Sequence, residues 1–372
     1  MPTIDADAHV VETERTWEYL DESERKFTPR TVSSAGDSRN RFWLIEGKRV
    51  LRAGNVGRDT PETVREMKDI EARLRHMDRL GVDIQVLYPS LFLSPLTVRP
   101  KVERALARSY NRWLAEIWRK GENRLRWAAV VPTLDMDHAL AEARFARDNG
   151  ACALYLRAGP HGSVGAAAKG LASLAPLAAR VLARGLRVRV KVTENKSLTD
   201  PYFYPLYEEA ARLNLPICIH ASTGSLTWQE MFEADSGFSK FKLPVVNTFH
   251  SLAYHGIPEK FPRLRFGFIE VGAQWLPYAL HDLKKRFERN GKILGNDFMR
   301  ENRLYVACQT SDDLAYVLRY AGENNIVIGT DYGHGDTAAE IEALRRLKTL
   351  SEVGSDAIEK ILSSNPRELY NL

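Results

Sequence analysis

The chain has 372 residues, of which 44% are hydrophobic and 27% charged, the ordinary composition of a globular protein with a large core. The net charge of +5 is mild and Lys and Arg form no run, which argues against a nucleic-acid-binding surface. No apolar stretch approaches the ~20 residues that span a bilayer, and the N-terminus lacks a signal-peptide pattern, so we expect a cytoplasmic protein without membrane contact.

The first predicted element is a short strand over residues 2–10 that ends in polar residues. Asp7 and His9 lie two positions apart, so in a strand their side chains point to the same face. A carboxylate oxygen and an imidazole nitrogen together suit Zn²⁺, Mn²⁺ or Fe²⁺. The alternative is that these residues only cap a turn, because two ligands do not make a metal site.

A long polar excursion follows, from residue 11 to residue 61. Within it, residues 41–51 predict a β-hairpin that turns near Glu46 and Gly47. We expect this insertion to lie over the mouth of an active site.

Helical and strand-like segments then alternate to the end of the chain. Helices are predicted over about 61–80, 102–120, 136–148, 201–213, 248–255, 275–290, 337–349 and 355–362. Strands are predicted over 82–88, 125–131, 151–157, 215–220, 264–270, 304–308 and 325–329. This alternation predicts an α/β fold with a parallel sheet, a (β/α)₈ TIM barrel that forms a single domain over residues 1–372. Apolar strand-like segments also contain Cys152, Cys218 and Cys308, which are expected to be buried free thiols.

Two segments stay ambiguous. Residues 159–185 are rich in Gly and Ala and predict one more helix, and residues 186–192 alternate as in a half-exposed strand of the barrel or of an insertion. Lys191 lies there, and some metal barrels use a carboxylated lysine to bridge two metals. Residues 221–247 predict a long loop whose aromatic residues, Trp228 among them, either meet a planar ligand or pack within the loop.

Two later strands end as the first one does. His220 ends the strand over 215–220, and Asp331 follows the strand over 325–329. Because the carboxyl ends of barrel strands meet at one end, Asp7, His9, His220 and Asp331 are expected to bind a metal. Asp331 is also a predicted general base. The alternative for His220 is a core histidine that bonds to the backbone.

Four further residues are candidates for chemistry or binding. Glu270, at a strand end, is either a further ligand or base, or the partner of an arginine. His250 is either an acid/base group or a partly exposed helix residue. His334 is expected to orient Asp331 or to meet substrate. Arg157 is expected to anchor a substrate carboxylate, and the alternative is a salt bridge at the rim of the barrel.

Together these motifs resemble the amidohydrolase-2 family, whose best-known branch contains aminocarboxymuconate-semialdehyde decarboxylase and related non-oxidative decarboxylases. The resemblance covers nearly the whole chain. It rests on residues 5–10, His220 in Pro-Ile-Cys-Ile-His, Glu270 in Phe-Ile-Glu-Val-Gly-Ala-Gln-Trp-Leu-Pro, Asp331 in Gly-Thr-Asp-Tyr-Gly-His, and residues 364–370.

The resemblance implies a distorted barrel, one divalent metal, Zn or Mn, and a homo-oligomer, dimer or larger. Two positions depart from the family pattern. Its first motif is His-x-His or Glu-x-His, whereas this chain has Asp7-x-His9. The decarboxylase branch often has an acid/base histidine where this chain has Glu270, whose pKa would have to be raised by burial. Residues 160–190 are expected to be an insertion, since this segment is usually shorter in the family.

The expected activity is metal-dependent loss of CO₂ from an aromatic or enol carboxylic acid. Glu270 or His250 would protonate the carbon, Asp331 would assist, and Arg157 would hold a second anionic group of this small-molecule substrate. The alternative is hydrolysis of an amide, lactone or C–C bond by a metal-bound water, with Asp331 as the base. A third possibility is a barrel without catalysis that serves as a binding or scaffold protein.

Overall fold

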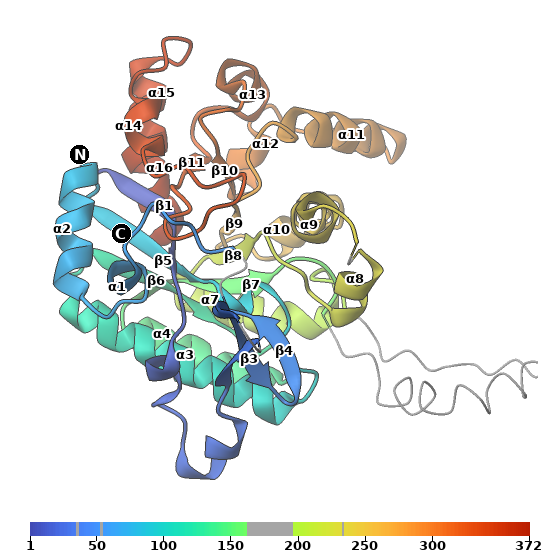
Figure 1. Cartoon of the computed structure of the whole chain (residues 1–372). Helices are drawn as coiled ribbons and strands as arrows, with labels where there is room; N and C mark the ends of the chain where they lie inside the picture. Colours follow the sequence, from blue (N-terminus) through green and yellow to red (C-terminus); the bar gives the residue numbers. More distant parts are fainter. Residues whose placement is uncertain (35–36, 53–54, 162–195, 233) are drawn as a thin grey trace, which may run out of the picture.

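The structure is a computed structural model that describes residues 1–34, 37–52, 55–161, 196–232 and 234–372. Its centre is an eight-stranded sheet in which every pair of neighbouring strands is parallel (Figure 1). In spatial order the strands are β1 (Ile4–Val10), β5 (Ile84–Pro89), β6 (Leu125–Val130), β7 (Ala151–Arg157), β8 (Ile217–His220), β9 (Phe266–Ile269), β10 (Leu304–Cys308) and β11 (Ile326–Ile328).

Backbone hydrogen bonds join the first strand to the segment that follows the last one. The carbonyl oxygen of Asp7 accepts from the amides of Thr330 at 3.1 Å and Asp331 at 2.9 Å, and the amide of His9 donates to the carbonyl of Tyr332 at 2.8 Å. The sheet is therefore a nearly closed barrel. The predicted (β/α)₈ fold is confirmed, with strands within a few residues of their predicted positions.

Helices surround the barrel on the outside (Figure 1). They are α1 (Glu62–Arg65), α2 (Ile70–Leu80), α3 (Pro100–Lys120), α4 (Met136–Asp148), α7 (Tyr204–Arg212), α8 (Leu226–Met231), α9 (Leu243–Tyr254), α10 (Ile257–Lys260), α11 (Leu276–Arg289), α12 (Phe298–Glu301), α13 (Leu314–Ala321), α14 (Ala343–Leu347), α15 (Ser355–Glu359) and α16 (Asn365–Tyr370). The longest, α3, begins at a proline and buries its apolar face, as its periodicity predicts.

Two predicted helices differ from those observed. The helix predicted over 61–80 is broken, because Met67 adopts a left-handed conformation with φ 55° and Asp69 then caps a new helix by accepting from the amide of Ala72 at 2.8 Å. The helix predicted over 337–349 is regular only in α14. Helix α13, which the sequence analysis did not predict, begins after its cap Asp313.

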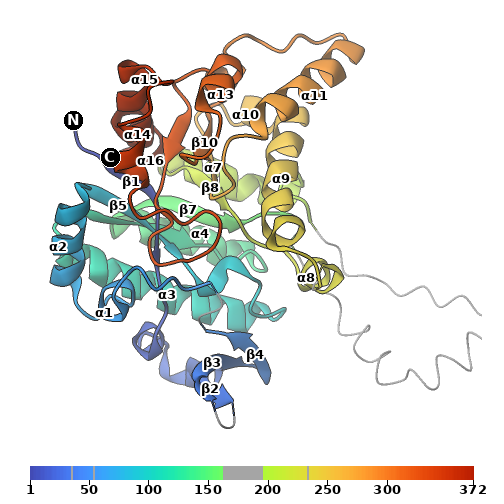
Figure 2. The same ribbon diagram turned by 45° about the horizontal axis from the view of Figure 1, so that its top comes forward.

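The insertion after β1 contains the predicted hairpin, β3 (Asp37–Ile45) and β4 (Lys48–Leu51), whose turn places Glu46 at φ 50° and Gly47 at φ 79°. A third strand, β2 (Arg30–Ser34), pairs with β3 and completes a small antiparallel sheet. Figure 2 shows this sheet, in blue, outside the ring of barrel strands.

The loop expected over 221–247 is partly helical, since it contains α8, a π-helical turn over Phe238–Lys242 and the start of α9. The helix and strand predicted within 159–192, most of the expected insertion over 160–190, and Lys191 lie outside the described residues. The three cysteines are buried and free, as predicted. Among the described helices, none combines the length and apolar character needed to cross a bilayer.

Candidate active site

The four metal ligands predicted at the strand ends come together at one end of the barrel. Strand β1 contributes Asp7 and His9, β8 ends at His220, and Asp331 follows β11. The register of β1 against β5 shifts between Asp5 and Ala8, in the stretch that contains Asp7. All these side chains are buried.

The possible ligand atoms form two groups that share His9: Asp7, His9 and His220 in one, and His9, Glu270, Asp331 and His334 in the other. Asp7 Oδ1 is 3.1 Å from His220 Nε2 and 3.4 Å from His9 Nε2. His9 Nε2 is also 3.3 Å from Asp331 Oδ1. The spacing of Asp7 and His9 along one strand therefore correctly predicted that both reach one point.

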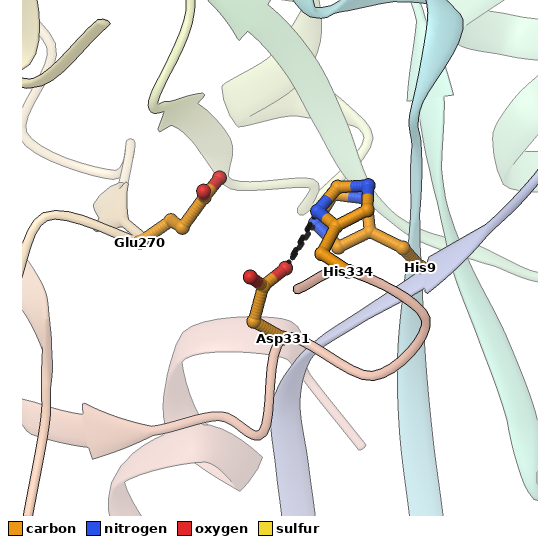
Figure 3. A group of neighbouring side chains, drawn as sticks. All are labelled: His9, Glu270, Asp331 and His334. Atoms are coloured by element: carbon orange, nitrogen blue, oxygen red, sulfur yellow. Dashed lines mark ion pairs between the residues drawn. The ribbon is translucent and has the colours of Figure 1, made fainter. Parts of the chain in front are cut away.

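Two further predicted residues, Glu270 and His334, join this cluster. Glu270 Oε2 is 2.9 Å from His220 Nδ1, and His334 Nδ1 is 2.7 Å from Asp331 Oδ1. Figure 3 shows the rings of His9 and His334 stacked beside Asp331, with Glu270 on the other side. The ring centroids of the two histidines are 3.8 Å apart.

The two carboxylates that follow strands have an unusual backbone. Glu270 has φ 69° and Asp331 has φ 50°, both in the left-handed region that residues other than glycine rarely adopt. Such strained residues persist where the surroundings fix them, and they concentrate at functional sites.

Burial and neighbouring charges together set the pKa values of the cluster. Burial and the neighbouring charge of Asp331 raise the pKa of Glu270 well above its usual range. Burial, together with the Asp7 and Asp336 carboxylates, likewise raises the pKa of Asp331. Burial also lowers the pKa of His9 to about 3. Two members shift the other way: although burial opposes it, the carboxylates of Asp7 and Glu270 raise the pKa of His220 well above its usual range, and His220 lowers the pKa of Asp7. A divalent cation beside Asp331 would favour the charged form of that carboxylate.

A buried network of hydrogen-bonded polar side chains connects β1 to its neighbours. The carboxylate of Asp5 accepts from the Thr330 amide at 2.9 Å and from Gln85 Nε2 at 2.9 Å. Gln85 in turn accepts from Arg73 Nε at 2.7 Å. This network links α2, β5, β1 and the segment after β11, so it holds the two sides of the barrel closure together.

The insertion after β1 holds the loop that carries His334. Val56 and His334 form an antiparallel bridge, and the amide of Gly57 donates to the carbonyl of Gly333 at 2.9 Å. The amide of Gly335 donates to the carbonyl of Asn55 at 3.0 Å. The insertion therefore lies at the mouth of the site, as the sequence analysis expected.

A cavity of about 850 Å³ opens next to the cluster. Glu270 and His334 line it, together with residues of the insertion and of the loop after β8. The charged and amide side chains on its wall that the sequence analysis did not single out are Arg52, Asn55, Gln229, Lys242 and Asp336. No spacing rule marks these residues, because they lie in the insertion and in the regions after β8 and β11, which the sequence analysis took as loops.

Three predicted residues lie elsewhere. His250 Nε2 bonds to Asp282 Oδ2 of α11 at 2.8 Å, which matches the alternative of a partly exposed helix residue. Arg157 forms an ion pair with Glu103 at 3.2 Å, which matches the alternative of a salt bridge at the barrel rim. Trp228 donates to the carbonyl of Ser239 at 3.2 Å and is not on the cavity wall, although Phe238 and Phe241 of the same region are.

Comparison with known proteins identifies the family of this barrel. A solved amidohydrolase from Mycobacterium avium subsp. paratuberculosis K-10 is 19% identical, with a TM-score of 0.74 and 99% of each chain covered. The 5-carboxyvanillate decarboxylase of Sphingomonas paucimobilis is 17% identical with a TM-score of 0.65, covering 100% of this chain and 99% of that one. A dihydroxybenzoic acid decarboxylase from Polaromonas sp. JS666, solved with manganese and the inhibitor 2-nitroresorcinol, is 16% identical with a TM-score of 0.65, covering 100% of this chain and 97% of that one.

At these identities the structural similarity shows the shared fold. The family assignment comes from the sequence, since the family model described as amidohydrolase matches residues 4–372. The match includes every residue of the cluster, and the chain therefore belongs to the amidohydrolase family of enzymes.

Proposed function

We propose that this protein is a metal-dependent decarboxylase that removes CO₂ from an aromatic or enol carboxylic acid. The observation that carries the proposal is a buried cluster of imidazoles and carboxylates beside a large cavity, with a glutamic acid on the wall between them. Decarboxylases of aromatic acids among the structural neighbours support the same reaction class.

The residues of the cluster fit a divalent metal. His9 Nε2 and both carboxylate oxygens of Asp331 are buried without a hydrogen-bond partner in the structure. Histidine nitrogen and carboxylate oxygen suit Zn²⁺ and Mn²⁺ alike, so the donor set does not separate the two. We assign Asp7, His9, His220 and Asp331 as metal-binding residues. When bound, a metal would act as a Lewis acid on the oxygens of the substrate.

Glu270 is the proposed proton donor. Loss of CO₂ leaves an electron pair on carbon, which must then take up a proton. Burial and the charge of Asp331 raise the pKa of Glu270 well above its usual range, which favours the protonated form that a proton donor needs. Glu270 also lines the cavity, where a substrate carbon would lie. It can therefore take the role that the decarboxylase branch often gives to a histidine.

Two cations on the cavity wall suit a carboxylate substrate better than Arg157 does. Arg52 stacks on Trp43, with its guanidinium carbon 5.1 Å from the ring centroid, and reaches the cavity from the insertion. Lys242 lines the cavity from the region after β8, and its ammonium donates to Thr337 Oγ1 at 3.2 Å. Apolar residues of the same wall, such as Phe238 and Phe241, suit a planar ring.

The test is a screen of hydroxylated benzoic acids and enol carboxylic acids with Mn²⁺-loaded and Zn²⁺-loaded protein. We expect release of CO₂ and, in D₂O, one deuterium on the carbon that lost the carboxylate. Glu270→Gln should lower kcat by ~10²-fold or more, as expected for loss of a general acid, with metal content unchanged.

The controls separate the alternative reaction. Uptake of ¹⁸O from labelled water into the product, without CO₂ release, would identify a hydrolase. CO₂ release at the wild-type rate by Glu270→Gln would leave decarboxylation standing and exclude Glu270 as the proton donor. Failure of the wild-type protein to take up Mn²⁺ or Zn²⁺ would contradict the metal-dependent mechanism altogether.

A further inference from the structure

The protonation of His334 is fixed by its outer neighbour, Ser90. Ser90 Oγ lies 2.8 Å from the carbonyl oxygen of Val10 and 2.8 Å from His334 Nε2. A carbonyl oxygen only accepts, so the single hydroxyl proton of Ser90 goes to Val10. His334 Nε2 must then carry a proton and donate to Ser90 Oγ. In a neutral ring, the lone pair of His334 therefore lies on Nδ1.

The same reasoning fixes His9. Its Nδ1 lies 3.0 Å from the carbonyl oxygen of Pro89, which can only accept, so Nδ1 carries the proton. The lone pair of a neutral His9 therefore lies on Nε2. In both histidines the outer nitrogen donates to an oxygen and the inner nitrogen is free to bind a cation, which is the usual arrangement of metal-ligating histidines.

These two lone pairs converge on one carboxylate oxygen. Asp331 Oδ1 is 3.3 Å from His9 Nε2 and 2.7 Å from His334 Nδ1. Four atoms are buried without a hydrogen-bond partner in the structure: His9 Nε2, His334 Nδ1 and both carboxylate oxygens of Asp331. Buried acceptors that face each other without a donor are strongly unfavourable unless a positive charge lies between them.

A divalent cation satisfies this arrangement better than a proton. A proton bridges two atoms, whereas His9, Asp331 and His334 together offer three ligand atoms that lie within 4.8 Å of one another. By contrast, both nitrogens of His220 face carboxylates, Asp7 Oδ1 at 3.1 Å and Glu270 Oε2 at 2.9 Å. His334 is therefore at least as well placed as His220 to bind a cation.

We propose that His334 is a ligand, through Nδ1, of the divalent cation in this site, in addition to the four residues predicted from the strand ends. The inference rests on the proposed function, because it requires that a metal binds here. It assigns His334 to metal binding, whereas the sequence analysis expected it to orient Asp331 or to contact substrate. Ser90 becomes a positioning residue that sets the tautomer of His334.

The test uses Mn²⁺ alone, titrated into full-length metal-free protein and followed by electron paramagnetic resonance, with a chelator to set the free concentration. The variants are His334→Ala, His334→Gln and Ser90→Ala, and the matched control is His250→Ala, which removes a histidine paired with Asp282 outside the cluster. Circular dichroism and thermal melting establish that each variant is folded.

We expect His334→Ala to weaken Mn²⁺ binding by more than the ~10–100-fold that loss of an outer partner causes, and Ser90→Ala to weaken it within that range. His250→Ala should bind as the wild type does. At saturating Mn²⁺, pulsed measurements of nitrogen hyperfine coupling should show one fewer coupled imidazole in His334→Gln than in the wild type. This readout keeps the test valid even if His334→Ala does not fold.

Unchanged affinity in His334→Ala, or unchanged nitrogen coupling in His334→Gln, would exclude His334 as a ligand while leaving the proposed decarboxylase intact. If the wild-type protein takes up neither Mn²⁺ nor Zn²⁺, the proposed function fails together with this inference. The two failures are therefore distinguishable.

Discussion

Gly57 and His334 are packed backbone against backbone: a Cβ built on Gly57 would lie 2.1 Å from the carbonyl oxygen of His334. The contact joins the insertion after the first strand to the loop after the last. It is possible only because residue 57 has no side chain. The position of the His334 ring over His9 therefore depends on a residue that is remote from it in sequence.

Gly57→Ala is expected to displace the loop that carries His334. The new methyl group meets backbone atoms, which cannot rotate away as a flexible side chain can. Mn²⁺ affinity should fall, and activity with it, while the barrel stays folded. Gly354→Ala is the matched control, since a Cβ there meets nothing within 4 Å. Wild-type Mn²⁺ affinity in Gly57→Ala would show that the loop adapts to the methyl group.

Arg73 is expected to stabilise the closed barrel. Its side chain is fully buried, donates to Gln85 at 2.7 Å and lies with its guanidinium carbon 3.5 Å from the ring centroid of Tyr332. Arg73→Met leaves Gln85 Oε1 without its donor, which should lower the free energy of unfolding by roughly 1–3 kcal/mol. Urea denaturation measures this change.

The matched control for that measurement is Arg75→Met on the same helix. Arg75 is exposed and pairs with Glu71 at 3.5 Å, four residues away, so its loss should cost less than about 1 kcal/mol. Equal effects of the two substitutions would argue against a stabilising role for the buried network of Arg73, Gln85 and Asp5.

Glu12 should make stability depend on pH. Burial raises the pKa of its carboxyl from 4.5 to about 8, despite a hydrogen bond from the Leu91 amide at 2.9 Å. The folded protein therefore keeps a proton that the unfolded chain releases above pH 4.5. The stability from this group is complete below pH 4.5 and is lost as the pH rises toward 8, by about 1.4 kcal/mol per pKa unit.

Glu12→Gln removes this titration and keeps the shape of the side chain. Urea denaturation at pH 5 and pH 8.5 should therefore show a smaller loss of stability in the variant than in the wild type. Parallel pH dependence in the two proteins would show that Glu12 is ionised in the fold.

Arg52 is expected to contribute to substrate binding. It is held by Glu66 and Glu14, each at 3.3 Å, and its side chain reaches the cavity wall. Arg52→Gln should raise KM for a carboxylate substrate about tenfold or more, the value of one charged hydrogen bond, with a smaller effect on kcat. Arg49→Gln, an exposed residue of β4, is the control and should leave KM unchanged. An unchanged KM in folded Arg52→Gln would exclude this contact.

The barrel itself could be predicted because its strands are buried on both faces, and so appear in the sequence as apolar runs bounded by polar residues. His220 and Asp331 were recognisable for this reason, since each directly follows such a run. The break at Met67 was not predictable, because a methionine in the left-handed region carries no local signal.

The site was predicted less completely, because the ion-pair and hydrogen-bond partners of its candidate residues lie far apart from them in the sequence. The sequence placed Arg157 at a strand end, but its partner Glu103 comes from α3 and lies 54 positions away. His250 similarly depends on Asp282, which lies 32 positions away. Arg52 and Asn55 reach the cavity only through the path of the insertion, which follows no periodic pattern.

The hydrogen bonds that close the barrel also determine when the site can exist. Asp5 and Thr330 are 325 positions apart, so a chain growing on the ribosome carries its first strand long before the residues that complete the ring are made. A cation bound by both His9 and Asp331 would bridge the first strand and the segment after the last strand. Complete metal binding would therefore require that the first strand and the segment after the last strand have already come together.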